Sequence, residues 1–234
     1  MTEARPRLTA LAEIALCSSV PTQILLGALL RLAGLSPIAP DGRLSLAFVL
    51  VLSIADTLLL ITLMVVLTRA RGESVGALWL GRRPVGREVL VGLLLVPVIF
   101  LLVAVLLNVL RLAAPWLHNV ETNPLEQLAA TPGEAAVFGL VAIVAGGVRE
   151  ELQRAFLLRR FERHLGGPVV GVVVLSAGFG LGHVVQGWDA AITTGVLGAV
   201  WAVLYLQRRS TIAPLTSHAG FNSLEVLRVA TFGA

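Results

Sequence analysis

The sequence predicts an all-α protein that crosses a membrane several times, as a polytopic bundle of about seven transmembrane helices. Three observations predict this fold: 56% of the 234 residues are hydrophobic, only 14% are charged, and long apolar runs recur along the chain. A soluble domain usually carries about 25% charged residues. A chain with so few polar groups cannot cover a water-facing surface, so we expect lipid to be its solvent.

About 20 apolar residues in a row are enough to cross the hydrocarbon core of a bilayer. The first apolar run is too long for the core of a signal peptide, so we expect it to be a retained helix. The fourth run continues as a helix beyond the membrane, because "LQRAFLLRRFERH" contains no Gly or Pro. The seven expected spans are residues 8–30, 44–67, 89–112, 134–159, 168–186, 190–207 and 212–231.

Charge in the loops predicts the orientation. The loop "TRARGESVGALWLGRRPVGRE" carries five arginines, whereas the loop "APWLHNVETNPLEQLAATPG" carries none. Because arginine-rich loops stay in the cytoplasm, we expect a cytoplasmic N-terminus and a C-terminus on the far side. The same short clusters argue against a nucleic-acid partner. Within the first loop, "ESVGALWLGRR" fits an interfacial helix and a plain polar loop equally well.

Polar side chains recur inside three of the expected spans at helical spacing. Residues four apart lie on one face of a helix, one turn apart. A rise of 1.5 Å per residue places these pairs at overlapping depths, about 14–25 Å from the cytoplasmic turns, so they can meet in one layer. The pairs are Glu150 and Arg154, Phe179 and His183, and His218 and Asn222, with Glu151 beside the first.

Glycines accompany this layer. The stretch "GFGLGH" places Gly178 and Gly182 four apart, with Gly180 between them. Small residues at that spacing let membrane helices approach closely, so we expect these glycines to bring His183 near a neighbouring helix. The lone thiol, Cys17, excludes an internal disulfide and a cysteine metal cluster, and is expected in the core.

Charged side chains are energetically unfavourable inside a membrane. Each costs about 2.5–3.5 kcal/mol at the centre of a span, and pairing lowers that cost without explaining the charge. A structural salt bridge or an interhelical hydrogen bond accounts for one such residue, whereas a cluster at one depth favours function. The isolated acids Glu13 and Asp56 are interpreted as capping, pairing or cavity-lining groups.

The residue types fit peptide hydrolysis without a serine or cysteine nucleophile. A carboxylate and an imidazole can share a water and take its proton. A second histidine and an amide can donate hydrogen bonds to an oxyanion. The sequence has no H-E-x-x-H zinc helix and no pair of intramembrane aspartates with a G-x-G-D pattern, so two other types of intramembrane protease fit it poorly.

These motifs resemble those of the CPBP family, also called Abi, which includes the type II CAAX prenyl proteases and their bacterial relatives. The resemblance covers about the last 100 residues, from position 134 to 231. It implies a four-helix catalytic core at 134–234 and leaves 1–133 as a three-helix N-terminal membrane segment. It also implies a multi-pass protein of a bacterial cell membrane that acts on a peptide or protein substrate.

The resemblance implies a role for each site residue. Glu150 would activate water with His183, Glu151 would pair with Arg154, and His218 and Asn222 would form the oxyanion hole.

The sequence departs from the family pattern E-E-x-x-x-R in one respect. The family's arginine position is Ala155 here, and Arg154 lies three residues after Glu151 and four after Glu150. The spacing to Glu150 favours the opposite assignment, with Glu151 as the base, so both glutamates stay candidates.

Metal dependence has two alternatives. Family members are often described as metalloproteases, and Glu150, His183 and His218 could hold zinc or another divalent ion. The same residues also suit a metal-free glutamate protease, and in the preferred interpretation no cofactor is required.

The expected function is therefore an intramembrane endopeptidase. The alternative is a non-catalytic membrane binding or assembly module on the same fold. A proton-coupled transporter is a third hypothesis, since carboxylate–histidine relays suit it, but the sequence shows no inverted repeat.

The orientation can be tested by cysteine labelling. A cysteine placed at Asn123 should react with a membrane-impermeant thiol reagent added from outside, and a cysteine placed at Arg83 should not, because arginine-rich loops face the cytoplasm. The reverse labelling pattern would overturn the orientation.

Overall fold

The computed structural model describes residues 4–233, which form helices and no strand beyond an isolated bridge between Ile38 and Leu44. The α-helices are α1 (Ala4–Leu16), α2 (Val20–Leu32), α3 (Leu46–Ala70), α4 (Val75–Trp79), α5 (Val85–Ala113), α6 (Pro132–Val141), α7 (Glu150–His164), α8 (Pro168–Leu181), α9 (Trp188–Arg208) and α10 (Ile212–Phe232). A π-helical stretch, η3 (Ala142–Arg149), joins α6 to α7. Short 3-10 turns are η1 (Pro115–Leu117), η2 (Pro124–Ala129) and η4 (Val184–Gln186). The predicted all-α class is confirmed.

The helices have the length and composition of a membrane bundle. Every expected span coincides with one or two helices, and α8 is apolar but shorter than a full span. The number seven stays a prediction. Within the described residues, four helical segments are long and apolar enough to cross a bilayer: Arg5–Leu32, which contains α1 and α2, Leu46–Ala70, Val85–Ala113 and Trp188–Arg208.

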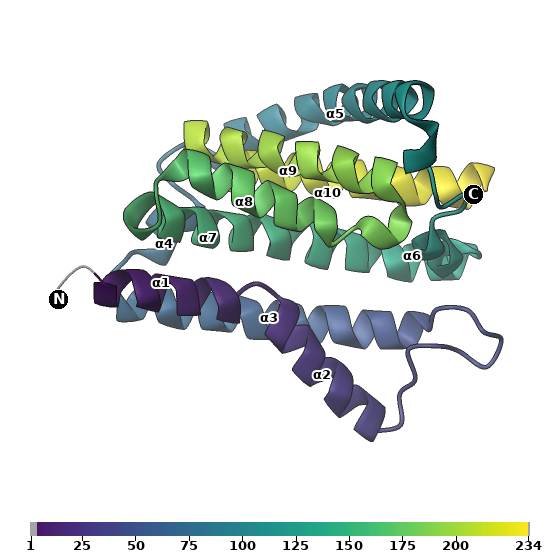
Figure 1. The fold of residues 1–234 in the computed structure, drawn as a ribbon, viewed down its shortest axis with the longest axis horizontal. Helices are drawn as coiled ribbons and strands as arrows, with labels where there is room; N and C mark the ends of the chain where they lie inside the picture. The colour runs from purple at the N-terminus through teal and green to yellow at the C-terminus, as the bar shows by residue number, and fades with distance from the viewer. Residues whose placement is uncertain (1–3, 234) are drawn as a thin grey trace.

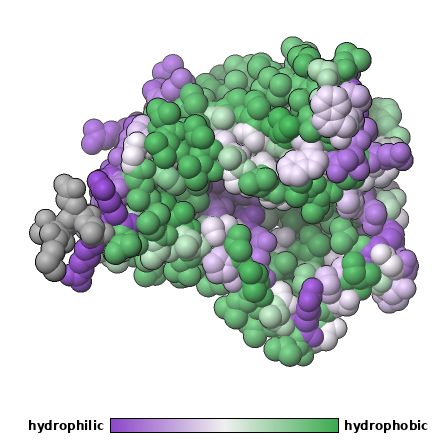
Figure 2. Space-filling view, in the orientation of Figure 1, coloured by the Kyte–Doolittle hydropathy of each residue, from purple (hydrophilic) through white to green (hydrophobic). Residues whose placement is uncertain are grey.

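The outer surface of the bundle is apolar. Hydrophobic residues cover most of the visible face, and hydrophilic residues gather mainly toward its two ends (Figure 2). Exposed side chains such as Leu29 on α2, Leu101 on α5 and Val173 on α8 would contact water in a soluble protein. A continuous apolar surface of this kind is suited to lipid, so the chain is an integral membrane protein.

The first expected span is two helices with a break between them. The structure separates α1 from α2 at residues 17–19, where Ser19 adopts a φ of 70°. Pro21 has no N–H, so it cannot bond the carbonyl of Cys17 four residues earlier. The side-chain amide of Gln153 on α7 donates to that carbonyl at 2.6 Å instead. The break therefore fixes the first helices to α7.

The elements form a bundle around α7 and α10 (Figure 1). α10 packs against α5 and η3, and α8 packs against α9, while α5 also touches α9. α1 and α3 run along one side of α7 and η3, and α2 diverges from them (Figure 1). Leu60, Met64 and Phe156 are fully buried where α3 meets α7. The N-terminal helices and the C-terminal helices thus share one core.

The segment "ESVGALWLGRR" forms the short helix α4, which closes one end of the bundle. Trp79 donates through its indole N–H to the carbonyl of Leu152, and its own carbonyl accepts from Thr211. The hydroxyl of Tyr205 donates to the carbonyl of Leu78. The segment therefore ties together the ends of α7, α9 and α10, rather than lying free as a loop.

Close helix approach comes from Gly180, not from the pair expected at positions 178 and 182. A Cβ on Gly180 would lie 2.6 Å from the carbonyl oxygen of Ala191 and 3.2 Å from Cα of Gly195 on α9. A Cβ on Gly178 would meet nothing within 4 Å, and one on Gly182 would meet only its own helix. The prediction that glycines of this stretch allow close helix approach is confirmed, but the glycine that faces α9 is Gly180 and not Gly178 or Gly182.

This difference can be measured within one helix. Gly180→Ala should lower the free energy of unfolding by about 1–3 kcal/mol, because the methyl group overpacks the contact between α8 and α9. Gly178→Ala is the matched control and should raise it by about 0.5–1 kcal/mol through helix propensity. Thermal unfolding in detergent compares the two variants, and equal effects would contradict the assigned contact.

Candidate active site

The candidate site begins where the π-helical stretch η3 passes into α7. A π-turn bonds residue i to i+5 and shifts the register of the residues that follow it. The stretch carries Gly146, where a Cβ would lie 2.5 Å from the side-chain nitrogen of Asn222 on α10. The missing side chain lets α10 lie directly against η3. Glu150 and Glu151 then follow as the first residues of α7.

Glu151 is the fully buried acid of the pair, with a side chain 1% exposed. The guanidinium of Arg154 donates to both of its oxygens, from Nε at 3.3 Å and 3.2 Å. The Nδ1 atom of His218 lies 2.9 Å from Oε1 of the same carboxylate. Arg154 thus pairs with Glu151 at the i,i+3 spacing, not with Glu150 at i,i+4.

His218 is held in one orientation. Its ring stacks on Trp201, with centroids 3.8 Å apart and planes 16° apart. The indole N–H of Trp201 donates to Ser217, which fixes the ring that His218 stacks on. An ionised carboxylate only accepts hydrogen bonds, so the contact with Glu151 places a proton on Nδ1. The Nε2 atom then faces Glu150, 3.9 Å from its Oε2.

Glu150 is the more accessible acid and belongs to a second charge network. Its Oε1 lies 3.2 Å from Nη2 of Arg149. Arg149 also pairs with Asp56 on α3, a side chain with no exposure. Thr22 and Gln23 on α2 donate to the same aspartate. Asp56 is therefore a pairing residue, one of the roles that the sequence allowed.

His183 lies just after α8 and reaches the cluster through an aromatic ring. Its Nδ1 is 2.8 Å from the carbonyl oxygen of Phe179, which can only accept. In the neutral imidazole, Nε2 is then free to accept a proton. The ring of Phe179 touches His183 at a centroid distance of 4.8 Å and His218 at 6.1 Å, and Arg154 lies over it.

Asn222 lies one turn beyond His218 on α10. Its side-chain nitrogen donates to the carbonyl of Ala142 at 3.1 Å, on η3. The structure therefore joins Glu150, Glu151, Arg154 and His218 directly and sets His183 and Asn222 at the margins. Sequence reasoning missed Trp201, because no motif marks a tryptophan in an apolar helix, and underweighted Asp56 and Arg149.

The arrangement of the acids and histidines bears on metal binding. Within residues 4–233, no group of three or more His, Cys, Asp or Glu side chains is arranged to hold one. Glu151 already accepts from a guanidinium and an imidazole. A fixed positive charge at that position repels a second cation. The zinc site considered from Glu150, His183 and His218 is not assembled by these contacts.

The buried pair between Glu151 and Arg154 should dominate local stability. Arg154→Gln leaves a buried carboxylate without its main partner and should cost about 3–5 kcal/mol of unfolding free energy. Adding Glu151→Gln removes the unpaired charge and should recover part of that loss. Arg228→Gln, whose side chain is 44% exposed, is the control and should cost at most about 1 kcal/mol. Unfolding in mixed micelles measures all four proteins, and an Arg154→Gln loss no larger than the control would contradict this account.

Residues 132–224 match the sequence profile of a family described as type II CAAX prenyl endopeptidase Rce1-like. No curated protein and no solved structure matches the chain. The matched segment contains α6 to α9 and the part of α10 with His218 and Asn222, so it includes all the candidate site residues. A family of this kind implies a protein or peptide substrate at a membrane. Residues 132–224 of this chain are therefore similar to the Rce1-like family of type II CAAX prenyl endopeptidases.

Proposed function

We propose that the protein is an intramembrane endopeptidase in which Glu150 is the general base. The main support for this proposal is the difference between the surroundings of Glu150 and those of Glu151. Both oxygens of Glu151 accept from Arg154, and one also contacts His218. The carboxylate of Glu150 has one guanidinium contact and a side chain 18% exposed, which leaves it able to bind water.

The proposed reaction needs a proton acceptor, a nucleophilic water and an oxyanion site. Glu150 and Nε2 of His183 hold the water, and Glu150 takes its proton as the oxygen attacks the scissile carbonyl carbon. The developing oxyanion accepts from His218 and from the amide of Asn222, which exchanges its present bond to Ala142. Glu150 then passes the proton to the leaving amine, and the C–N bond breaks.

The charges of the layer support His218 as a donor. Asp56, Glu150 and Glu151 contribute three negative charges, and Arg149 and Arg154 contribute two positive charges. This excess of negative charge favours hydrogen-bond donors in the layer, and Nε2 of His218 faces Glu150 at 3.9 Å.

Asp56 and Arg149 are proposed as positioning residues. Arg149 touches Glu150, and Asp56 fixes Arg149 from α3, so the N-terminal helices set the orientation of the base. On this basis 1–133 serves as a supporting membrane segment and 134–234 as the catalytic core.

The proposed chemistry is metal-free, because within residues 4–233 the acids and histidines are not grouped to hold a metal ion and Arg149 already pairs with Glu150. The substrate is a peptide or protein in a bacterial cell membrane, with the N-terminus of this chain in the cytoplasm. A hollow with hydrophilic groups at its floor opens between α8 and α2 (Figure 2), which offers a route from the bilayer toward the layer. The second candidate, a non-catalytic binding module, is favoured by the shifted arginine at position 154 and predicts no cleavage.

The catalytic proposal predicts strongly non-additive losses. Asn222→Ala should lower the cleavage rate about 10²–10³-fold by removing one oxyanion donor, with the protein still folded in the membrane. Glu150→Gln should be at least as severe, and combining the two should cost little more, because both act in one step. Proteomic comparison of membranes from cells with each variant measures cleavage, and immunoblotting measures abundance.

Glu225→Gln is the control on the same helix as Asn222, with a partly exposed side chain. It should cleave at the wild-type rate. Full cleavage by Glu150→Gln and Asn222→Ala at normal abundance would remove the catalytic proposal and leave the binding module.

A further inference from the structure

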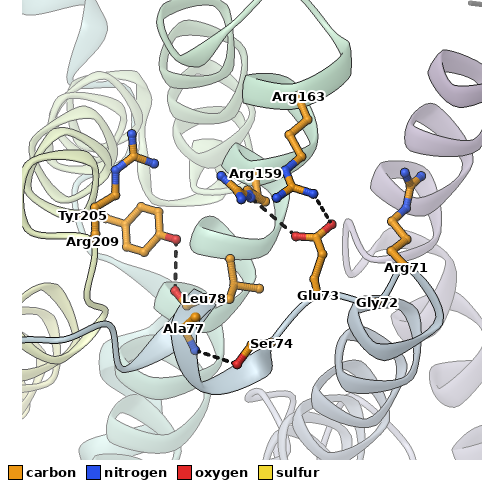
Figure 3. A pocket seen from close by; sticks show the side chains of 10 residues that line it. All are labelled: Arg71, Gly72, Glu73, Ser74, Ala77, Leu78, Arg159, Arg163, Tyr205 and Arg209. Atoms are coloured by element: carbon orange, nitrogen blue, oxygen red, sulfur yellow. Dashed lines mark hydrogen bonds and ion pairs between the residues drawn. The ribbon is translucent and has the colours of Figure 1, made fainter.

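A pocket of about 360 Å³ lies at the end of the bundle that α4 closes, away from the candidate active site. Its walls come from the loop between α3 and α4, from α4, from the last turns of α7 and from the end of α9 (Figure 3). Ten residues line the pocket, of which four are arginines and one, Glu73, is an acid. The arginines are Arg71, Arg159, Arg163 and Arg209.

The arginines around this pocket outnumber the acids with which they pair. Each carboxylate accepts from at least two arginines, and two positive charges remain in excess. The hydrogen bond from Arg209 and those from its other partners hold the pKa of Glu162 below its usual value, so this acid is already ionised and counted. The network contains Arg71, Arg159, Arg160, Arg163 and Arg209, with Glu13, Glu73 and Glu162.

Two donors in this network are buried without an acceptor. Within residues 4–233, Nη2 of Arg71 and Nη2 of Arg160 have no hydrogen-bond partner, and the side chain of Arg160 is 0% exposed. A buried charged donor without an acceptor is costly. Arg71 lines the pocket directly, so an anion bound there would supply one of the missing acceptors.

The surrounding field is positive. Desolvation, together with Arg71, Arg160 and Arg163, lowers the pKa of His164 below its usual value, and Glu73 only partly opposes this. The imidazole therefore stays neutral and lies with its Nε2 3.1 Å from Nη1 of Arg71. Desolvation opposes a charge of either sign, but the three arginines that lower this pKa also attract an anion.

Guanidinium groups match the planar pairs of oxygens on phosphates and carboxylates. The pocket lies at the ends of two candidate spans, because Arg71 follows the last residue of α3 and Arg209 follows the last residue of α9. This is the level at which lipid phosphates meet a membrane protein. We propose that the pocket binds a phosphate group, carried by an anionic phospholipid headgroup or by a free phosphate.

The arrangement of the arginines suits a ligand that enters from outside. In Figure 3, Arg71 and Arg209 stand on opposite sides of the pocket, with Arg159 and Arg163 between them and next to Glu73. The side chains of Arg163 and Arg209 are 43% and 52% exposed, so both can turn toward a ligand, and Glu73 keeps Arg159 and Arg160 as partners.

The test measures binding to the purified full chain in an uncharged detergent at constant ionic strength, by titration calorimetry. The ligands are inorganic phosphate, dihexanoyl phosphatidylglycerol and dihexanoyl phosphatidylcholine. We expect the first two to bind more tightly than the zwitterionic lipid. Tighter binding of phosphatidylglycerol than of phosphate identifies a lipid headgroup as the source, and the opposite order identifies free phosphate.

The pocket is tested by matched double variants. Arg163→Gln with Arg209→Gln should weaken binding at least about tenfold, since each removes a charge-assisted donor. Arg69→Gln with Arg87→Gln removes the same charge from exposed positions at this end and should change binding less than about twofold. Equal losses in the two double variants, or equal binding of all three ligands, would overturn the proposal.

A second measurement uses the wild-type protein and needs no variant pocket. Bound phosphate would add a negative charge beside His164, whose charged neighbours are Arg71, Arg160, Arg163 and Glu73. The pKa of His164, followed by NMR with saturating ligand, should therefore rise. The resonance absent from His164→Gln assigns the signal. An unchanged pKa at saturation would refute a phosphate at this site.

Discussion

The buried ion pair between Glu151 and Arg154 is the interaction on which the rest of the site depends. Two opposite charges with side chains 1% and 4% exposed can persist in a bilayer only if each satisfies the other. That requirement fixes the rotamers of both residues on α7. Oε1 of Glu151 also contacts Nδ1 of His218 and so orients the imidazole. The ring of Trp201 stacks on one face of that imidazole.

The pair also determines which helices meet. α10 must lie close enough for His218 to reach Glu151, and the π-helical stretch with Gly146 provides that approach. α9 must lie close enough to cover Arg154, which donates to the carbonyl of Gly198 and lies over the ring of Phe179. The small residues of η3, α8 and α9 are therefore part of the electrostatic arrangement, because a larger side chain would separate the charges from their partners.

The sequence predicted the parts of this arrangement that depend on periodicity. Apolar runs gave the helices and polar pairs at i and i+4 gave the candidate residues, because both follow from the geometry of one helix. Contacts between helices were not predictable in the same way. The spacing of Arg154 suited either glutamate, and the structure places it on Glu151. Likewise, Gly180 rather than Gly178 faces α9, since spacing does not tell which face meets a neighbour.

The N-terminal helices lie outside the matched segment, yet the charges of α7 depend on them. Asp56 on α3 pairs with Arg149 next to Glu150, and Glu13 on α1 pairs with the fully buried Arg160 about three turns further along. Without these acids, each of the two buried guanidinium groups would lose one of its two carboxylate partners and keep only Glu150 or Glu73. Gln153 lies between these positions and completes the broken backbone at Cys17. Three contacts at successive levels of η3 and α7 thus couple the two parts of the chain, so the surroundings of Glu150 and the charge around the arginine-lined pocket both depend on helices outside the matched segment.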